Sequence, residues 1–236
     1  MKKLFSLIVV LVMILSCFAS CGDEATSEAT SEATSEEASE ATSEESQGTT
    51  DITESVAKGI FSKIDPEKGF LFKMSVEQQG VKIGMEMGMK GENAYTISTT
   101  SMGEISMVEK DIIKDGKSYV LDDTKKTYTV SDASSESFSF DAFTESLFGS
   151  VEYVKTVKET YNGTEYITDC FKSTGDGSEV KVYIDGDNNI KYFYMQGVYC
   201  PVELSDTLPE GCFDIPSDYT EIKAQKGEAV EDNTEM

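Results

Sequence analysis

The sequence predicts a mainly β protein of the α+β class, built on one antiparallel sheet of about ten strands with a helix in each half. Three observations predict this class. Apolar residues alternate with a period of two from Phe70 onward. Turn-forming dipeptides such as Asp115-Gly116 and Asn162-Gly163 separate these runs. Helical spacing is confined to two short segments.

The first 20 residues have the pattern of a secretory leader. Lys2 and Lys3 give a positive start, and an apolar run of about a dozen residues extends from Leu4 to Leu15. A membrane-spanning helix takes roughly 20 apolar residues, so this run is too short to span and fits the apolar core of a signal peptide.

Small residues precede a cysteine at the end of this leader. Phe18–Gly22 resembles the lipobox of bacterial lipoproteins, which implies cleavage after Ser20 and a diacylglyceryl group on Cys21. Two acyl chains suffice for stable anchoring, whereas one binds marginally. Ile14–Cys17 is a competing register, with a better aliphatic first residue but a bulky second one. An ordinary signal peptide cut at the same bond is the other alternative. We favour Cys21, which places the protein on the outer face of the bacterial cytoplasmic membrane.

A tether follows the anchor over residues 21–51. Ala25-Thr26-Ser27-Glu28 repeats and then degrades, giving ten carboxylates from Gly22 to Asp51 without a lysine, an aromatic or a large aliphatic residue. Such a segment cannot bury enough apolar surface to offset its chain entropy, so we expect a disordered spacer. A second disordered acidic segment is expected at 223–236.

Charge and composition exclude several function classes. The formal net charge is −24, and an acidic field repels nucleic acid and anionic headgroups. The chain has no histidine, which removes the commonest general base and most zinc sites. We therefore expect neither an enzyme nor a bound cofactor.

The domain is expected over residues 52–222 and opens with a short amphipathic helix. Ile52, Val56, Ile60, Phe61 and Ile64 have helical spacing. Thr53 can serve as the N-cap of this helix, and Pro66 ends it.

The strands come next. A hairpin with one apolar face is predicted first, because Phe70, Phe72, Met74 and Val76 precede a Gln79-Gly80 turn and a second alternating run to Lys90. The further predicted strands are 94–100, 104–110, 111–114, 117–122, 126–131, 151–161, 164–172, 179–185 and 190–199. A second helix near Asp141–Phe148 lies within a Phe-rich segment that starts at Phe138.

This pattern resembles the LolA/LppX/LprG-like lipoprotein carriers. The resemblance rests on the helix before Phe70, the chained hairpins, the segment Phe138–Phe148 and the ending Leu208–Tyr219, similar to "Lp…F.iP..Y". It covers roughly residues 52–222 and implies a strongly curved antiparallel sheet forming an unclosed barrel, with helices covering the open side over an apolar cavity. The soluble carrier of that group lacks an anchor, so this chain fits the anchored branch better.

Methionine is the most informative residue type for function. Met74, Met85, Met87, Met89, Met102, Met107 and Met195 lie in or beside predicted strands. Methionine adapts to irregular apolar ligands, but it also fills gaps in ordinary cores. We predict a lipid or other hydrophobic ligand in a cavity lined by Phe70, Phe72, Met74, Val76, Ile83, Met85, Met87 and Phe143. The alternative is an interaction or sensory module with a filled core, which engages another envelope protein.

The remaining motifs have plainer interpretations. Asp185–Asn189 has acids at calcium-loop spacing but lacks the expected Gly and Glu further on, so a β-turn is favoured and no metal is expected. Asp122-Asp123 is a carboxylate pair that also fits a turn. Cys200 and Cys212 could form a loop-closing disulfide, or they and Cys170 could all be reduced.

Overall fold

The computed structural model describes residues 54–133 and 139–223. The leader, Cys17, Cys21, the tether, Ile52, Thr53, Phe138 and the predicted tail from 224 lie outside the described residues. The described part is mainly β, with two helices and a 12-stranded open sheet of order β12-β6-β5-β4-β3-β2-β1-β11-β10-β9-β8-β7. The first helix in the described part of the chain is α2. No helix among the described residues is long and apolar enough to cross a membrane.

The described chain clusters into two compact units. Unit 1 comprises the residues up to Lys63 and Phe143–Cys200, and unit 2 comprises Ile64–Ala142 and the residues from Pro201. The strand β11 (Val198–Ser205) and the helix α3 (Phe140–Phe148) each contribute residues to both units.

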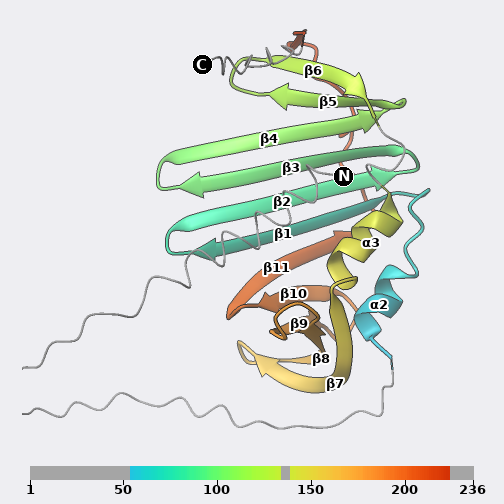
Figure 1. Ribbon diagram of the computed structural model, residues 1–236, viewed down its shortest axis with the longest axis vertical. Helices are drawn as coiled ribbons and strands as arrows, with labels where there is room; N and C mark the ends of the chain where they lie inside the picture. Colours follow the sequence, from blue (N-terminus) through green and yellow to red (C-terminus); the bar gives the residue numbers. More distant parts are fainter. Residues whose placement is uncertain (1–53, 134–138, 224–236) are drawn as a thin grey trace, which may run out of the picture. The chain divides into compact units, whose positions relative to one another are not determined.

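Unit 2 contains the chained hairpins (Figure 1). Its strands are β1 (Phe70–Gln78), β2 (Val81–Lys90), β3 (Asn93–Met102), β4 (Ile105–Lys114), β5 (Lys117–Asp122), β6 (Thr127–Asp132) and β12 (Thr220–Glu221). Each of β1 to β5 pairs antiparallel with the strand that follows it, whereas β12 pairs parallel with β6 over two residues. The prediction of a wholly antiparallel sheet is therefore wrong at this edge.

Tight turns set the register of these hairpins. Gln79-Gly80 and Asp115-Gly116 both have positive φ at their two residues, which is the geometry of two-residue hairpin turns. The turn after β5 forms through Asp122, whose Oδ1 accepts from the backbone N–H of Thr124 and Lys125. The prediction that Asp122-Asp123 is a turn is confirmed.

Unit 1 contains α2 (Val56–Phe61) and the second group of strands. The strands are β7 (Val151–Tyr161), β8 (Thr164–Ser173), β9 (Glu179–Ile184) and β10 (Ile190–Met195). Asn162-Gly163 makes the β7–β8 turn with positive φ at both residues. In the β9–β10 turn, Asp185 Oδ1 accepts from the N–H of Asp187 and Asn189, so the β-turn favoured there is confirmed.

Four predicted elements need correction. The expected strands 104–110 and 111–114 are one strand, because no turn residue interrupts the chain between Lys110 and Asp111. The expected strand 190–199 is instead two, because Gln196-Gly197 takes φ of 51° and 81° and reverses the chain. The opening helix is shorter than predicted and begins after Ser55, whose Oγ accepts from Lys58 N–H. It ends at Phe61, well before Pro66.

The topology is also not a simple meander. β1 pairs with β11, which lies more than 120 residues further along the chain, with Met74 opposite Val202. Local turn signals cannot predict this pairing, because it depends on contacts between residues far apart in sequence.

Candidate functional site: the two faces of the unit 2 sheet

The sheet of unit 2 separates methionine from lysine. Opposite residues of paired antiparallel strands point to the same face, and neighbours along a strand point to opposite faces. The register therefore places Met74, Met85, Met87, Met89, Met102 and Met107 on one face, here called the methionine face. It places Lys73, Lys82, Lys90, Lys110, Lys114 and Lys117 on the other, here called the lysine face.

Seven of the eight predicted ligand-lining residues lie on the methionine face. They are Phe70, Phe72, Met74, Val76, Ile83, Met85 and Met87. Phe143 instead belongs to unit 1, where its ring packs against Phe61 at a centroid distance of 6.2 Å.

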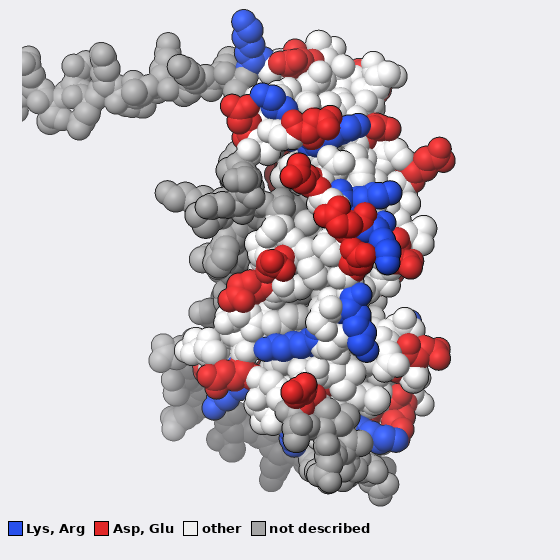
Figure 2. Space-filling view, turned by 90° about the vertical axis from the view of Figure 1, so that its right-hand side faces the viewer, with Lys and Arg blue, Asp and Glu red and all other residues white. Residues whose placement is uncertain are grey.

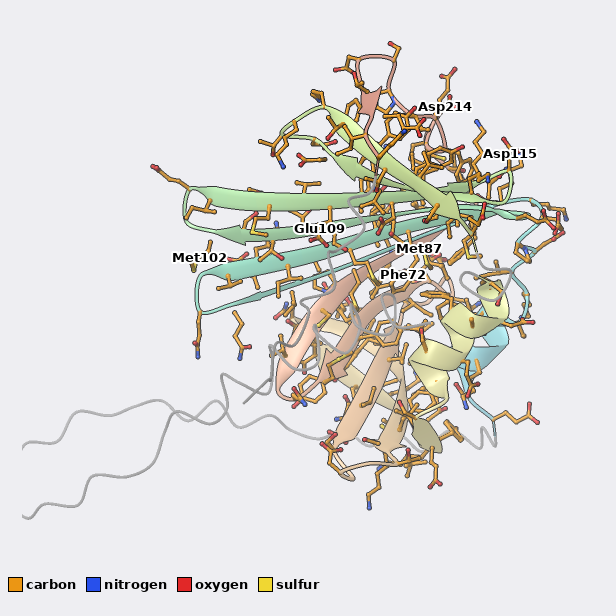
Figure 3. The ribbon with its side chains drawn as sticks, turned by 45° about the horizontal axis from the view of Figure 1, so that its top comes forward. Phe72, Met87, Met102, Glu109, Asp115 and Asp214 are labelled. Carbon is orange, nitrogen blue, oxygen red and sulfur yellow. The ribbon has the colours of Figure 1, made fainter. Side chains whose placement is uncertain are left out.

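Exposure increases along the methionine face from one end of the hairpins to the other. Phe72 and Met87 are 0% and 2% exposed, whereas Met102, Ile105 and Met107 are 58%, 64% and 61% exposed. Ile83 and Met85 are half-buried. Figure 3 shows Met102 at the tip of the β3–β4 hairpin, away from Phe72 and Met87. The inner half of this face is packed core, and its outer half presents a cluster of large apolar side chains.

The inner half is packed by aromatic contacts within unit 2. The ring of Phe140, at the start of α3, meets Phe70 edge-on at 5.2 Å. Such pairs stabilise cores beyond the area that they bury.

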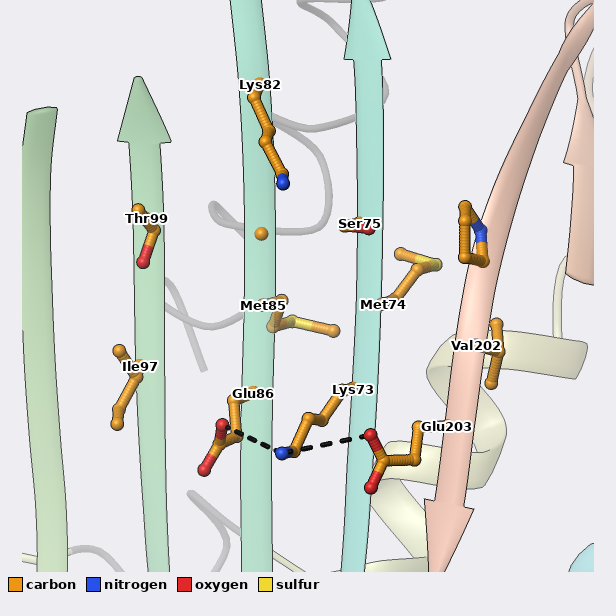
Figure 4. A pocket seen from close by; sticks show the side chains of 12 residues that line it. Lys73, Met74, Ser75, Lys82, Met85, Glu86, Ile97, Thr99, Val202 and Glu203 are labelled. Carbon is orange, nitrogen blue, oxygen red and sulfur yellow. Dashed lines mark ion pairs between the residues drawn. The ribbon is translucent and has the colours of Figure 1, made fainter. Parts of the chain in front are cut away.

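A groove of about 410 Å³ lies mostly on the lysine face (Figure 4). Its lining includes Lys73, Ser75, Lys82, Gly84, Glu86, Thr99 and Glu203, together with Met74 and Met85 of the predicted set. Lys73 Nζ lies between two carboxylates, 3.6 Å from Glu86 and 3.8 Å from Glu203. The lining is strongly charged, so this groove does not suit an acyl chain.

The ending that carried the family resemblance covers part of the lysine face. Leu208, Cys212, Phe213, Ile215 and Tyr219 pack against a core of Leu71, Tyr95, Ile112 and Leu121. This covering segment, residues 206–219, is fastened by the 3.0 Å ion pair between Lys114 and Asp214. Burial, followed by the hydrogen bond to Glu86, raises the pKa of Tyr95 far above its usual range.

Unit 1 holds a separate buried polar site around Asp169. Its carboxylate is fully buried and accepts hydrogen bonds from Ser55 Oγ (2.8 Å), Ala57 N–H (2.7 Å) and Thr156 Oγ1 (2.6 Å). Two of these donors lie at the start of α2. The Asp169 carboxylate therefore holds the start of α2 in place, and it accepts a hydrogen bond from each of the three donors.

Six tyrosines of unit 1 form one contact cluster. They are Tyr161, Tyr166, Tyr183, Tyr192, Tyr194 and Tyr199. Tyr161 and Tyr199 stack at 3.8 Å, and Tyr183 OH donates to Glu159 at 2.7 Å. This cluster was not predicted from the sequence, although Tyr192 and Tyr194 are two residues apart in a strand and therefore share a face.

The three described cysteines are free thiols. Cys170 and Cys200 are buried, which raises the pKa of each to about 11, and Cys212 is half-buried. The Cys200–Cys212 disulfide considered from the sequence is not formed. No group of three or more Cys, Asp or Glu side chains in 54–133 and 139–223 is arranged to hold a metal ion.

One face of the molecule carries charges of both signs. Acidic and basic side chains are interspersed over the face shown in Figure 2. An interspersed pattern of this kind gives no strong field of one sign on that face.

Comparisons with known proteins give no family. No family model matches the chain, and no curated protein matches it. The solved structures that match include an uncharacterized conserved protein from Thermus thermophilus, and this alignment covers 72% of this chain and 100% of that one. The identity is 9% and the TM-score 0.43, a likeness too weak to bear on function.

Proposed function

We propose that this chain is a membrane-anchored extracytoplasmic lipoprotein that binds a lipid or other hydrophobic ligand at the methionine face. The observation that carries the proposal is the collection of six methionines on one face, whose exposure increases toward the outer hairpin ends. Soft, unbranched side chains suit irregular apolar ligands. Exposed apolar clusters on a protein surface commonly mark binding sites.

The mechanism requires no bond-making step. An acyl chain lying over Met102, Ile105 and Met107 would cover apolar surface that now faces solvent. Each CH₂ group removed from water contributes about 0.8 kcal/mol. Half-buried Ile83 and Met85 extend the same surface toward the packed half of the face.

The proposal also includes the curvature of the sheet and the location of the protein. The resemblance to LolA/LppX/LprG-like carriers supports a strongly curved, unclosed barrel with helices over its open side. The lipobox-like Phe18–Gly22 supports acylation of Cys21 and a place on the outer face of the cytoplasmic membrane. Cys21→Ala should release the protein from the membrane fraction and remove the acyl mass, whereas Cys17→Ala should do neither if Cys21 is the acylated residue.

Native mass spectrometry tests the binding proposal. The protein is extracted gently from its own membrane and measured under native and denaturing conditions. Covalent acyl mass persists on denaturation, so an additional lipid mass that disappears identifies a bound ligand. A native mass equal to the denatured mass, repeated after incubation with envelope lipids, would contradict the proposal.

A second candidate is an interaction or sensory module that engages another envelope protein. The observation that favours it is the tight packing of Phe70, Phe72 and Met87, which are nearly inaccessible in the structure. In that case the exposed hairpin end contacts protein rather than lipid, and no lipid adduct is expected.

A further inference from the structure

The groove on the lysine face has a glycine in its floor. Gly84 and Gly88 lie two turns of the alternation apart on this face of β2. A Cβ at Gly88 would collide with Tyr95 and with Leu208 of the covering segment. A Cβ at Gly84 would meet its nearest neighbour only at 4.0 Å. The protein itself therefore fills the space above Gly88, whereas the space above Gly84 is open and belongs to the groove.

Three polar side chains surround this floor. Ser75 and Thr99 lie directly opposite Gly84 on the two neighbouring strands. Lys82 lies on the same face of β2, and Figure 4 shows its side chain extending along the strand toward the level of Ser75 and Thr99. Within the described part of the chain, Lys82 takes part in no ion pair and the two hydroxyls in no hydrogen bond. Glu77, opposite Lys82, is exposed and does not line the groove. An ammonium group and two hydroxyls around a glycine suit a carboxylate.

The other end of the groove has the opposite charge. Lys73 Nζ lies 3.6 Å from Glu86 and 3.8 Å from Glu203, so this end has one more negative than positive charge. Glu86 lies two residues from Gly84 on the same face of β2, which corresponds to about 7 Å along the strand. The groove therefore has a cationic end and an anionic end that are separated by about two residues of an extended chain.

We propose that this groove binds a dipeptide, with its carboxylate at Lys82 and its ammonium group at Glu86 and Glu203. An extended dipeptide spans about 7 Å, since each residue adds roughly 3.3–3.6 Å, and this length matches the separation of the two ends. The volume of about 410 Å³ is within the range of small-molecule sites. Half-buried Ile97 in the lining offers an apolar contact to a side chain of the ligand.

Charge complementarity also sets the direction of the ligand. A reversed dipeptide would place its ammonium group at Lys82 and its carboxylate at Glu86 and Glu203, where like charges repel. The site lies on the lysine face, so the inference does not depend on ligand binding at the methionine face.

Three forms of alanylalanine test the need for both charges. They are the free dipeptide, the N-acetyl dipeptide and the dipeptide amide, each titrated by calorimetry. The protein is extracted from its own membrane in a non-ionic detergent. We expect saturable binding of the free dipeptide at millimolar concentration or below. Each blocked form lacks one of the two charges and should bind about tenfold more weakly.

Matched variants locate the site. Gly84→Ala places a methyl group in the floor without a clash inside the protein, and it should weaken binding of the free dipeptide severalfold. Lys82→Gln should weaken binding of the free dipeptide about fivefold and leave binding of the amide, which has no carboxylate, unchanged. Lys90→Gln is the control, because Lys90 is an exposed lysine on the same strand and face that does not line the groove.

Three outcomes would overturn the inference. One is equal affinity for the free and the blocked dipeptides, and another is an equal loss of binding in Lys82→Gln and Lys90→Gln. The third is the absence of saturable binding of the free dipeptide. Each of these would leave hydrophobic binding at the methionine face unaffected, because its probes are different.

Discussion

Met74 of β1 lies directly opposite Met85 of β2, and the neighbouring residues Lys73 and Glu86 lie opposite each other on the other face. These two neighbouring pairs show how the two faces of the unit 2 sheet differ. One face is apolar and rich in methionine, and the other is charged. The division follows from the alternation of side chains along a strand, so it was already present in the sequence.

The exposed end of the methionine face should bind hydrophobic probes. The triple variant Met102→Ser, Ile105→Ser, Met107→Ser should lower the fluorescence of bound Nile red severalfold, because the three largest exposed side chains of that end are lost. Its urea midpoint should change little, since exposed positions contribute little to stability. Val108→Ser, at a 42% exposed position on the lysine face, is the control. An equal loss of fluorescence in this control would contradict the assignment of the probe site.

Two glycines of β2 should respond to the same substitution to different extents. A Cβ at Gly88 would lie 2.3 Å from Tyr95 Cε1 and 2.7 Å from a Leu208 methyl carbon. Gly88→Ala should therefore destabilise the protein by about 1–3 kcal/mol in urea unfolding, as overpacking does.

Gly84 is the matched control, on the same strand and the same face. A Cβ there meets its nearest neighbour, Thr99 Cβ, at 4.0 Å. Gly84→Ala should change the free energy of unfolding by less than about 1 kcal/mol. Equal effects of the two substitutions would show that residues 206–219 do not cover the sheet at Gly88.

The chained hairpins were predictable because their signals are local. Positive-φ turns at Asp115-Gly116 and Asn162-Gly163 and the alternation from Phe70 fix strand positions within a few residues. The face shared by Phe72, Met74, Met85 and Met87 followed from the same alternation.

The rest depended on contacts that no local signal encodes. The sequence does not indicate that β1 would pair with β11, or that Leu208 and Phe213 would cover Tyr95. It also could not separate packed from exposed methionines, because Met87 and Met107 occupy equivalent positions in the alternation. Only the packing partners of each residue decide its exposure.

Removing the buried charge of Asp169 should destabilise unit 1. Asp169→Asn replaces one acceptor oxygen by an NH₂ group that faces donors from Ser55, Ala57 and Thr156. Hydrogen bonds to charged groups contribute about 1.5–3 kcal/mol each, so we expect a loss of at least about 2 kcal/mol in urea unfolding. The start of α2 should also become a site of proteolytic cleavage. Asp187→Asn in the exposed β9–β10 turn is the control and should behave as the unmodified protein. An unchanged midpoint for Asp169→Asn would contradict the role assigned to this carboxylate.

Stability should fall at alkaline pH because of the buried thiols. Burial raises the pKa of Cys170 and Cys200 to about 11, above the value of about 8.5 for an exposed thiol. A group whose folded pKa is raised contributes stability that is complete below its unfolded pKa and is lost as pH rises through the folded pKa. The free energy of unfolding should therefore decrease between about pH 8.5 and 11.

The double variant Cys170→Ala, Cys200→Ala should show a shallower decrease over the same range, whatever its stability at pH 7. A thiol label at pH 8 should react with half-buried Cys212 first, and with the other two only on unfolding. An identical alkaline slope in the variant would assign the loss to other groups, such as Tyr95.

Methyl NMR of the methionines tests whether a hydrophobic ligand binds at the exposed end of the methionine face. The protein is labelled with ¹³C at the Met ε-methyl groups and titrated with dodecyl maltoside below its critical micelle concentration. Single substitutions assign the signals of Met85, Met87, Met89, Met102, Met107 and Met195. A binding site at the exposed methionine face predicts saturable shifts at Met102, Met107 and half-buried Met85, with Met89 and Met195 unchanged. No saturable shift at Met102 and Met107, or uniform shifts of all methionine methyls, would contradict it.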